Sequence, residues 1–182
     1  MIYMFLADGF EEVEALCPLD LMRRAGLSVK TVGIDKKEIT GAHGITVFSD
    51  IISDEYEAAD KSNTEMIFLP GGMPGTLNLA KSAIVTDAIH QAHASGTYIA
   101  AICAAPSILG DMGLLHGKEA ICYPGFEERL IGARISDKKV VKDSNIITAA
   151  GMGVAYDMGI LIVETLCGSE KATELRRATI HE

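Results

Sequence analysis

Short apolar runs alternate with amphipathic segments along most of the chain. Runs of apolar and β-branched residues predict strands at residues 2–6, 28–33, 66–69, 97–102 and 120–122, and near Val140 and Ile146. Apolar residues at helical spacing predict helices at residues 11–26, 77–79, 84–94, 106–112 and 154–166, with a short helical segment from Phe126. Residues 38–50 carry Gly41 and Gly44 between extended pieces, which predicts a hairpin-like excursion.

Strands that alternate with helices and are joined by short glycine-containing turns are typical of an α/β fold. We expect a mostly parallel sheet with helices on both faces, in a single domain covering residues 1–182. Functional residues of such sheets gather at the carboxyl ends of the strands. Three stretches directly follow predicted strands and therefore meet at that edge: residues 8–14, 70–75 and 103–106.

The composition narrows the range of partners. With 182 residues, 48% hydrophobic and 23% charged, the chain can bury one good core. Its formal net charge of -9 opposes binding to nucleic acid or to an anionic membrane surface. The first residues lack a basic segment followed by an apolar one, and no run reaches the ~18 apolar residues that cross a bilayer. We therefore expect a cytoplasmic protein.

Four cysteines are scattered along the chain: Cys17, Cys103, Cys122 and Cys167. They form no C-x-x-C pair and have no nearby set of histidines, so the spacing indicates neither a zinc site nor a disulfide framework. Nothing in the sequence suggests a metal or an organic cofactor. We expect reduced thiols.

Cys103 lies where the predicted strand at residues 97–102 turns into the next helix. At such an elbow the side chain stands at the top of the sheet, with unpaired N–H groups of the helix behind it. Helix N-termini lower the pKa of thiols, so the position indicates a reactive thiolate. The alternative is a buried core cysteine, the usual fate of a free thiol.

The predicted partners of this thiol are backbone amides and a carboxyl group. Gly71 and Gly72 follow a strand, and their amides with that of Ala104 can form an oxyanion hole; a plain tight turn is the alternative. Glu14 faces the apolar side of the first helix, whereas Glu12 points to water. A carboxyl group in apolar surroundings has a raised pKa and can exchange a proton with a thiol or a substrate. A glutamate placed merely to favour the helix dipole is the alternative.

Together these motifs resemble the ThiJ/PfpI superfamily, in the branch of the parkinsonism-associated protein deglycase. The resemblance covers essentially the whole chain and rests on four segments: ADGFEEVEALCPLDLMRRAG at residues 7–26, IFLPGGMPG at 67–75, IAAICAAPSIL at 99–109 and ITAAGMGVAYDMGILIVETLCG at 147–168. It implies a flavodoxin-like three-layer sandwich that forms a homodimer. Cys103 would be an oxidation-sensitive nucleophile touched by a protonated Glu14, beside an anion pocket formed by Gly71, Gly72 and Ala104.

The resemblance also implies a range of activities. They include cofactor-free conversion of methylglyoxal or glyoxal to hydroxy acids and removal of glycation adducts, so the partner would be a small reactive aldehyde or a glycated substrate. An alternative is an oxidative-stress sensor or redox-regulated chaperone that acts through oxidation of Cys103. Amidase, isonitrile hydratase or PfpI-type peptidase chemistry is a further alternative, and the peptidase is disfavoured because Ala104 stands where the protease-like branch has a histidine.

Three other positions bear on the predicted pocket. Tyr123 stands where the human-like branch has a histidine; because a tyrosine is a poor base at neutral pH, Glu14 is the expected proton carrier. His43 stands where relatives often have an arginine, and is either a weak anion contact supplied by the partner subunit or a surface-loop histidine. Cys122 is either a packing residue or a thiol that resolves an oxidised Cys103.

Overall fold

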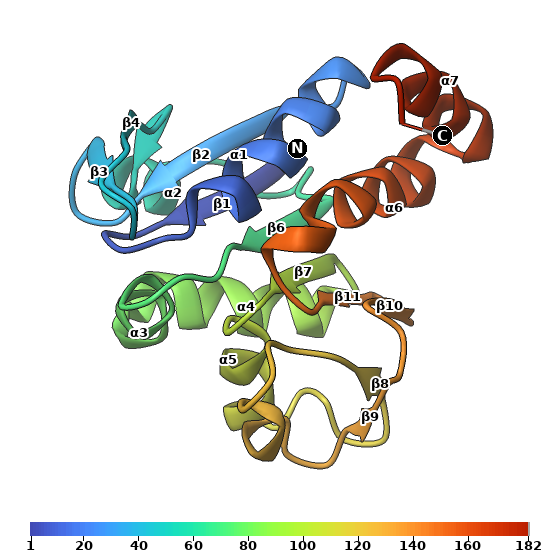
Figure 1. Cartoon of the computed structure of the whole chain (residues 1–182). Coiled ribbons are helices and arrows are strands. Elements are labelled where there is room, and N and C mark those ends of the chain that lie inside the picture. Colours follow the sequence, from blue (N-terminus) through green and yellow to red (C-terminus); the bar gives the residue numbers. More distant parts are fainter. Residues whose placement is uncertain (182) are drawn as a thin grey trace.

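A seven-stranded sheet forms the centre of the molecule (Figure 1). The computed structural model describes residues 1–181. The strands lie in the order β10-β11-β7-β6-β1-β2-β5, and every neighbouring pair is parallel except β10 and β11. Their bounds are β1 Ile2–Leu6, β2 Val29–Gly33, β5 Ile51–Ile52, β6 Met66–Leu69, β7 Tyr98–Ile102, β10 Val140–Asp143 and β11 Ile146–Ala149. The predicted α/β fold with a mostly parallel sheet is confirmed.

Helices surround this sheet, and two small strand pairs lie outside it. The pairs are antiparallel β3 Glu38–Thr40 with β4 Thr46–Phe48, and parallel β8 Glu119–Ala120 with β9 Arg134–Ile135. The α-helices are α1 Glu12–Arg24, α2 Ser53–Ala58, α3 Gly75–Lys81, α4 Ala83–Ser95, α5 Pro106–Asp111, α6 Ala155–Cys167 and α7 Ser169–Ala178. Two 3₁₀ turns, η1 Glu127–Arg129 and η2 Met152–Val154, complete the regular structure of the described residues.

The order of the long elements follows the sequence prediction, whereas some short ones differ. The hairpin expected within residues 38–50 is the β3–β4 pair. The strand predicted at residues 120–122 is wrong beyond Ala120, because the N–H of Ile121 donates to the Thr148 hydroxyl at 3.0 Å and leaves the ladder. The short elements β5 and α2 had no separate signal in the sequence, since each is only a few residues long.

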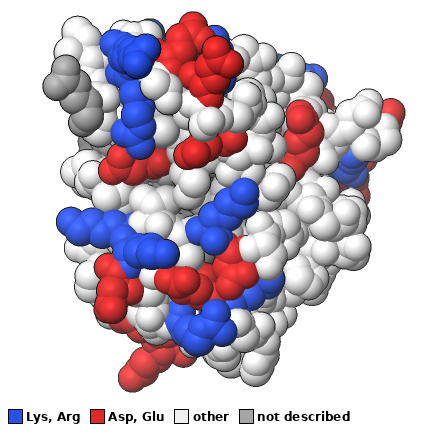
Figure 2. Space-filling view, turned by 90° about the vertical axis from the view of Figure 1, so that its right-hand side faces the viewer, with Lys and Arg blue, Asp and Glu red and all other residues white. Residues whose placement is uncertain are grey.

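The surface carries both signs of charge. Figure 2 shows lysine and arginine side chains interleaved with aspartate and glutamate on one face, so neither sign forms a continuous area there. Within residues 1–181, no helix combines the length and the apolar character needed to cross a membrane.

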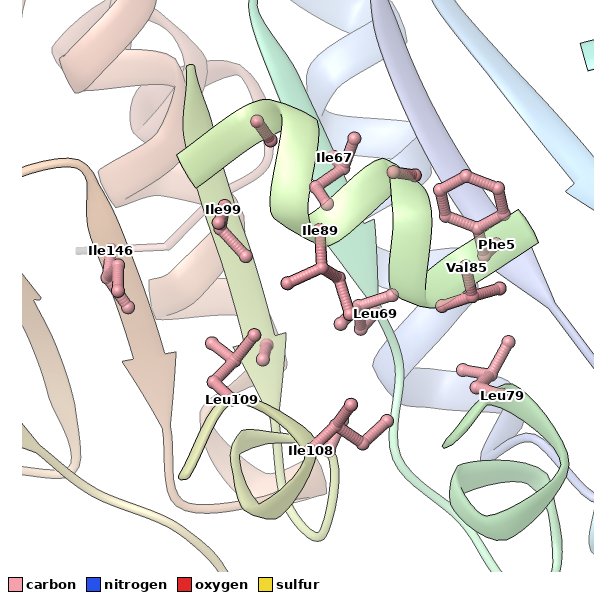
Figure 3. Close-up of a cluster of buried hydrophobic side chains, with 14 of the residues drawn as sticks. Phe5, Ile67, Leu69, Leu79, Val85, Ile89, Ile99, Ile108, Leu109 and Ile146 are labelled. Atoms are coloured by element: carbon pink, nitrogen blue, oxygen red, sulfur yellow. The ribbon is translucent and has the colours of Figure 1, made fainter. Parts of the chain in front are cut away.

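Alternate residues along the strands face opposite helical layers, as a buried parallel sheet requires. Met4 of β1 packs in a cluster with residues of α1 and α6. Its neighbour Phe5 packs on the other side, in the cluster shown in Figure 3, where Ile89 of α4 lies over Ile99 of β7. The two clusters fix helices on both faces of the sheet.

Close packing of α1 against α6 sets the position of the first helix. A methyl group on Gly159 of α6 would lie 2.6 Å from Leu21 Cδ1 and 3.1 Å from Pro18 Cα, so only glycine allows this approach. Leu175 and Ala172 of α7 pack in one cluster with Leu21 of α1 and so cover this contact. The N-terminal end of α1, which carries Glu14, is thereby held over the carboxyl edge of the sheet.

We expect Ile99→Ala to lower the free energy of unfolding by about 2–5 kcal/mol, because it leaves a cavity in the core. Ile99 is 0% exposed, whereas Ile180 is 92% exposed and provides a matched control. Ile180→Ala should change stability by no more than about 0.5 kcal/mol. Urea unfolding followed by circular dichroism measures both, and equal losses would contradict the packing described.

Candidate active site

Cys103 occupies the turn between β7 and α5. Its φ of 64° lies in the left-handed region, a costly conformation for a residue with a side chain. Two backbone hydrogen bonds hold it: its N–H donates to Ala149 O at 2.9 Å, and its C=O accepts from the N–H of Tyr123 at 2.8 Å. The side chain is partly exposed. The predicted strand-to-helix elbow is therefore present, with its nucleophile candidate at the strained position.

Glu14 lies beside this thiol in the interior. It is 1% exposed and its side chain is hydrogen-bonded to Cys103. Oε2 accepts the N–H of Gly71 at 3.0 Å, and the amide of Met152 also faces the carboxyl group. Burial raises the pKa of Glu14 to about 7. The sequence prediction of an inward-facing carboxyl group with a raised pKa agrees with this geometry.

Two glycines allow these elements to converge. A methyl group on Gly71 would lie 2.5 Å from Glu14 Oε2 and 2.6 Å from Cys103 Cβ. Gly72 has a φ of 92°, and a methyl group there would lie 2.3 Å from the backbone nitrogen of Glu11. The turn after β6 can therefore pass between α1 and the Cys103 elbow only because both positions lack a side chain.

The anion pocket differs in part from the expected one. The amides of Gly72 and Ala104 face the Cys103 sulfur as predicted. The Gly71 amide does not complete the set, because its N–H is committed to the carboxyl group of Glu14. Gly71 therefore positions the acid, and two amides are left to stabilise negative charge at the sulfur or on a bound oxygen.

The expected low pKa of the thiol is wrong for the resting site. Burial and the neighbouring Glu14 charge raise the pKa of Cys103 to about 12, although the Ala104 and Gly72 amides act in the opposite direction. Helix α5, Pro106–Asp111, is short, so its dipole is outweighed by these two effects. At neutral pH Cys103 and Glu14 consequently act as a pair that gives up its first proton near pH 7.

Tyr123 lines the entrance to this pair. It is 51% exposed, and a methyl group on Gly151 would lie 3.3 Å from its ring. The same methyl position is 3.9 Å from Glu14 Oε1, so ring and carboxyl group flank one short backbone segment. The sequence analysis placed Tyr123 at the predicted pocket, but it assigned no role to Gly151 or Met152, which lie in the resemblance segment at residues 147–168.

His43 and Glu12 form a second group at the start of α1. The expectation that Glu12 points to water is wrong, since it is 4% exposed. Its carboxylate accepts the N–H groups of His43 at 2.8 Å and Ile45 at 3.3 Å, and Oε2 lies 2.8 Å from His43 Nδ1. These bonds tie the β3–β4 turn to the helix. The His43 side chain itself is 69% exposed and contacts Glu12 and Glu11 rather than the thiol.

Glu11 joins these two groups and was not singled out by its sequence position. It is the N-cap of α1, and its Oε2 accepts the N–H of Glu14 at 2.7 Å. Its Oε1 lies 3.9 Å from His43 Nδ1. One imidazole and two carboxylates thus meet within 4.8 Å. Because their atoms are engaged with one another and with backbone amides, we interpret them as an ion-pair network.

Cys122 lies on the opposite side of the sheet from the reactive thiol. It is 1% exposed and packs in the cluster of Leu109 and Ile99, whereas Cys103 packs against the cluster on the α1 and α6 side. The structure therefore supports packing for Cys122 and not the resolving role left open by the sequence.

Most of the chain matches a known family at the level of its sequence. A family model described as DJ-1/PfpI covers residues 1–165. The chain belongs to the DJ-1/PfpI family. Protein dj-1beta of Drosophila melanogaster is 35% identical over 180 residues, covering 97% of this chain and 95% of that protein. A family relative in Caenorhabditis elegans, named glutathione-independent glyoxalase DJR-1.2, is 29% identical over 167 residues, covering 91% and 87% of the two chains.

Solved DJ-1 structures share the fold. The structure described as Toxoplasma gondii DJ-1, oxidized, superimposes with a TM-score of 0.93 at 29% identity, covering 99% of this chain and 97% of that one. The predicted family and its flavodoxin-like sandwich are therefore confirmed. Membership of the DJ-1/PfpI family is consistent with a glyoxalase-type or stress-related role.

We expect Glu12→Ala to destabilise the protein by about 1–3 kcal/mol, because the amides of His43 and Ile45 lose their buried acceptor. Although burial opposes it, hydrogen bonding from His43 holds the pKa of Glu12 below its ordinary value of 4.5. The stabilisation is therefore present above pH 4.5 and is lost as the pH falls through the folded-state pKa.

Hydrogen exchange of the His43 and Ile45 amides measures this effect locally, and both should exchange faster in the variant. Glu38→Ala, at an exposed position of β3, is the control and should leave both rates unchanged. Unaltered exchange in Glu12→Ala would refute the anchoring role.

Proposed function

We propose that the protein converts small α-oxoaldehydes such as methylglyoxal or glyoxal to hydroxy acids without a cofactor, using Cys103 as the nucleophile. One observation carries this proposal: a buried carboxyl group, Glu14, is hydrogen-bonded to a partly exposed thiol at a strand-to-helix elbow. The pKa of Glu14, about 7, suits a group that must both accept and donate a proton at neutral pH. The C. elegans relative named as a glyoxalase supports this reaction class.

In the proposed first step, the sulfur of Cys103 attacks the aldehyde carbon. The thiol proton passes to the Glu14 carboxylate as the S–C bond forms, which removes the need for a preformed thiolate. The amides of Gly72 and Ala104 stabilise the negative charge that develops on the carbonyl oxygen. Glu14 then gives its proton to that oxygen, so the product is a neutral hemithioacetal and Glu14 is again a carboxylate.

In the proposed second step, the hemithioacetal rearranges to a thioester. Glu14 removes the proton from the carbon that carries the sulfur and returns it to the neighbouring carbonyl carbon through an enediol, while the hydroxyl proton on the first carbon passes to the oxygen of the second. The former aldehyde carbon is thereby oxidised and its neighbour reduced, with no external electron acceptor. Water then hydrolyses the thioester, releases lactate from methylglyoxal and restores the Cys103 thiol. The sum is methylglyoxal plus water to lactate.

The same chemistry extends to glycated substrates, whose early adducts release or present a reactive carbonyl. A homodimer is the proposed working form. The large apolar side chains of Phe48 in β4 and of Ile45 in the preceding turn are 74% and 54% exposed, and they support an interface on this hairpin. His43 lies in the same turn as Ile45 and would then border the contact.

An oxidative-stress sensor or redox-regulated chaperone is the second candidate. The amides of Gly72 and Ala104 around the sulfur would stabilise a sulfinate, and a close structural relative is described as oxidized. The raised pKa of Cys103 weighs against it, because peroxide reacts with the thiolate. We therefore favour the aldehyde reaction.

We expect Glu14→Gln to lower the rate of lactate formation from methylglyoxal by about 10²–10⁴-fold, because it removes the proton carrier. Cys103→Ser should abolish it. Cys167→Ser changes an exposed thiol on α6 and serves as the control, with an unchanged rate. Lactate is quantified enzymatically, with all variants first shown to be folded by circular dichroism.

The outcomes separate the candidates. Full activity in Glu14→Gln would refute the role of the carboxyl group, and full activity in Cys103→Ser would refute the mechanism. No lactate from the wild type, together with a selective gain of two oxygens at Cys103 under mild peroxide, would favour the sensor instead.

A further inference from the structure

Glu11 connects the reactive pair to the outer ion-pair network. Its backbone is extended, with φ of -84° and ψ of 123°, and its side chain caps α1 by accepting the N–H of Glu14 at 2.7 Å. The side chain is only 14% exposed. A hydrogen bond to the backbone of Glu14 restricts where the first helical turn can place that residue's carboxyl group. Glu11 therefore positions the proposed acid through the backbone of the first helical turn.

The charge of Glu11 acts on the same residue. Two carboxylates close together in a partly desolvated site resist ionising at once. Burial is the main reason for the raised pKa of Glu14, and the negative charge of Glu11 raises it further. The hydrogen bonds from Cys103 and from the amides of Gly71 and Met152 act in the opposite direction.

His43 offsets this charge from the β3–β4 turn. Its Nδ1 lies 2.8 Å from Glu12 Oε2 and 3.9 Å from Glu11 Oε1. Hydrogen bonding to Glu12 and the charge of Glu12 raise the pKa of His43, so the imidazolium persists to higher pH. Around Glu14, the titratable groups are then Cys103 from the elbow, Glu11 from its own helix and, at the entrance, Tyr123; His43 and Glu12 act through Glu11.

We propose that Glu11 is a positioning residue that sets the proton affinity of Glu14, and that His43 moderates this effect by partly neutralising Glu11. The inference deepens the proposed function, because it assigns the origin of the acid–base behaviour that the aldehyde reaction uses. It predicts effects of opposite sign for the two charges. Loss of Glu11 charge should make the pair ionise at lower pH, and loss of His43 charge should make it ionise at higher pH.

The test measures the rate at which iodoacetamide alkylates Cys103 as a function of pH, by mass spectrometry of the Cys103 peptide. Alkylation requires the anionic form of the pair, whichever of the two groups holds the remaining proton, so the midpoint reports its first ionisation. Glu11→Gln keeps an oxygen that can cap the Glu14 N–H while removing the charge. His43→Gln removes the cation, and Glu170→Gln, which neutralises an acid in the first turn of α7, is the control.

We expect Glu11→Gln to move the midpoint down by about one pH unit. His43→Gln should move it up by a smaller amount that shrinks with added salt, since the imidazole is exposed. Glu170→Gln should leave it unchanged. An unmoved or raised midpoint in Glu11→Gln, or shifts of the same sign in Glu11→Gln and His43→Gln, would overturn the proposal.

This readout is independent of the proposed reaction, because alkylation needs no aldehyde. A wild type that makes no lactate would refute the proposed function while the midpoints still decide the role of Glu11. Where lactate is formed, the pH profile of kcat/KM should shift in the same directions as the alkylation midpoints. A merely structural role for Glu11 would lower stability without moving either profile.

Discussion

A carboxyl group held out of water against a thiol organises the carboxyl edge of this sheet. The contact exists because β1, β6 and β7 are adjacent and parallel, so their following turns meet at one edge. It opposes stability, because the pKa of Glu14 is raised from 4.5 to about 7 and its charged form is disfavoured in the fold. Folding therefore loses free energy from this residue as the pH rises from 4.5 to 7. The left-handed φ of Cys103 also lowers the stability of the folded state.

The rest of the molecule supplies what this contact requires. Gly71 and Gly72 lie between α1 and the Cys103 elbow, where a side chain on either residue would collide with Glu14 or Glu11. The buried carboxylate of Glu12 binds the β3–β4 turn and so fixes this turn to the start of α1. Helix α6 packs closely against α1 through Gly159 and holds its remaining length in place. Elements far apart in sequence thus converge on one acid and one sulfur.

The parts that the sequence predicted correctly are those determined by local pattern. Alternation of strands and helices gave the sheet, and helical spacing placed Glu14 inward. The same reasoning was wrong for Glu12. Its hydrogen-bond partners come from a hairpin about thirty residues further along the chain, and a helical wheel shows only residues of the helix itself. The pKa of Cys103 was misjudged for a related reason: the helix end is visible in sequence, whereas burial and a carboxylate neighbour are properties of the fold. The hydrogen bond from the Gly71 amide to Glu14 likewise depends on tertiary contacts and could not be predicted from local sequence.

The high proton affinity of the Cys103 sulfur has a consequence for selectivity among electrophiles. A thiol that is protonated at rest reacts slowly with whatever diffuses past it. In the proposed reaction, the thiol is activated when the attacked group develops a negative oxygen within reach of the Gly72 and Ala104 amides, while Glu14 accepts the proton. Carbonyl compounds meet this condition, and alkylating agents or peroxides without such an oxygen gain no comparable assistance. Under the proposed mechanism, the site therefore reacts slowly with most small electrophiles and reacts readily only with carbonyl compounds.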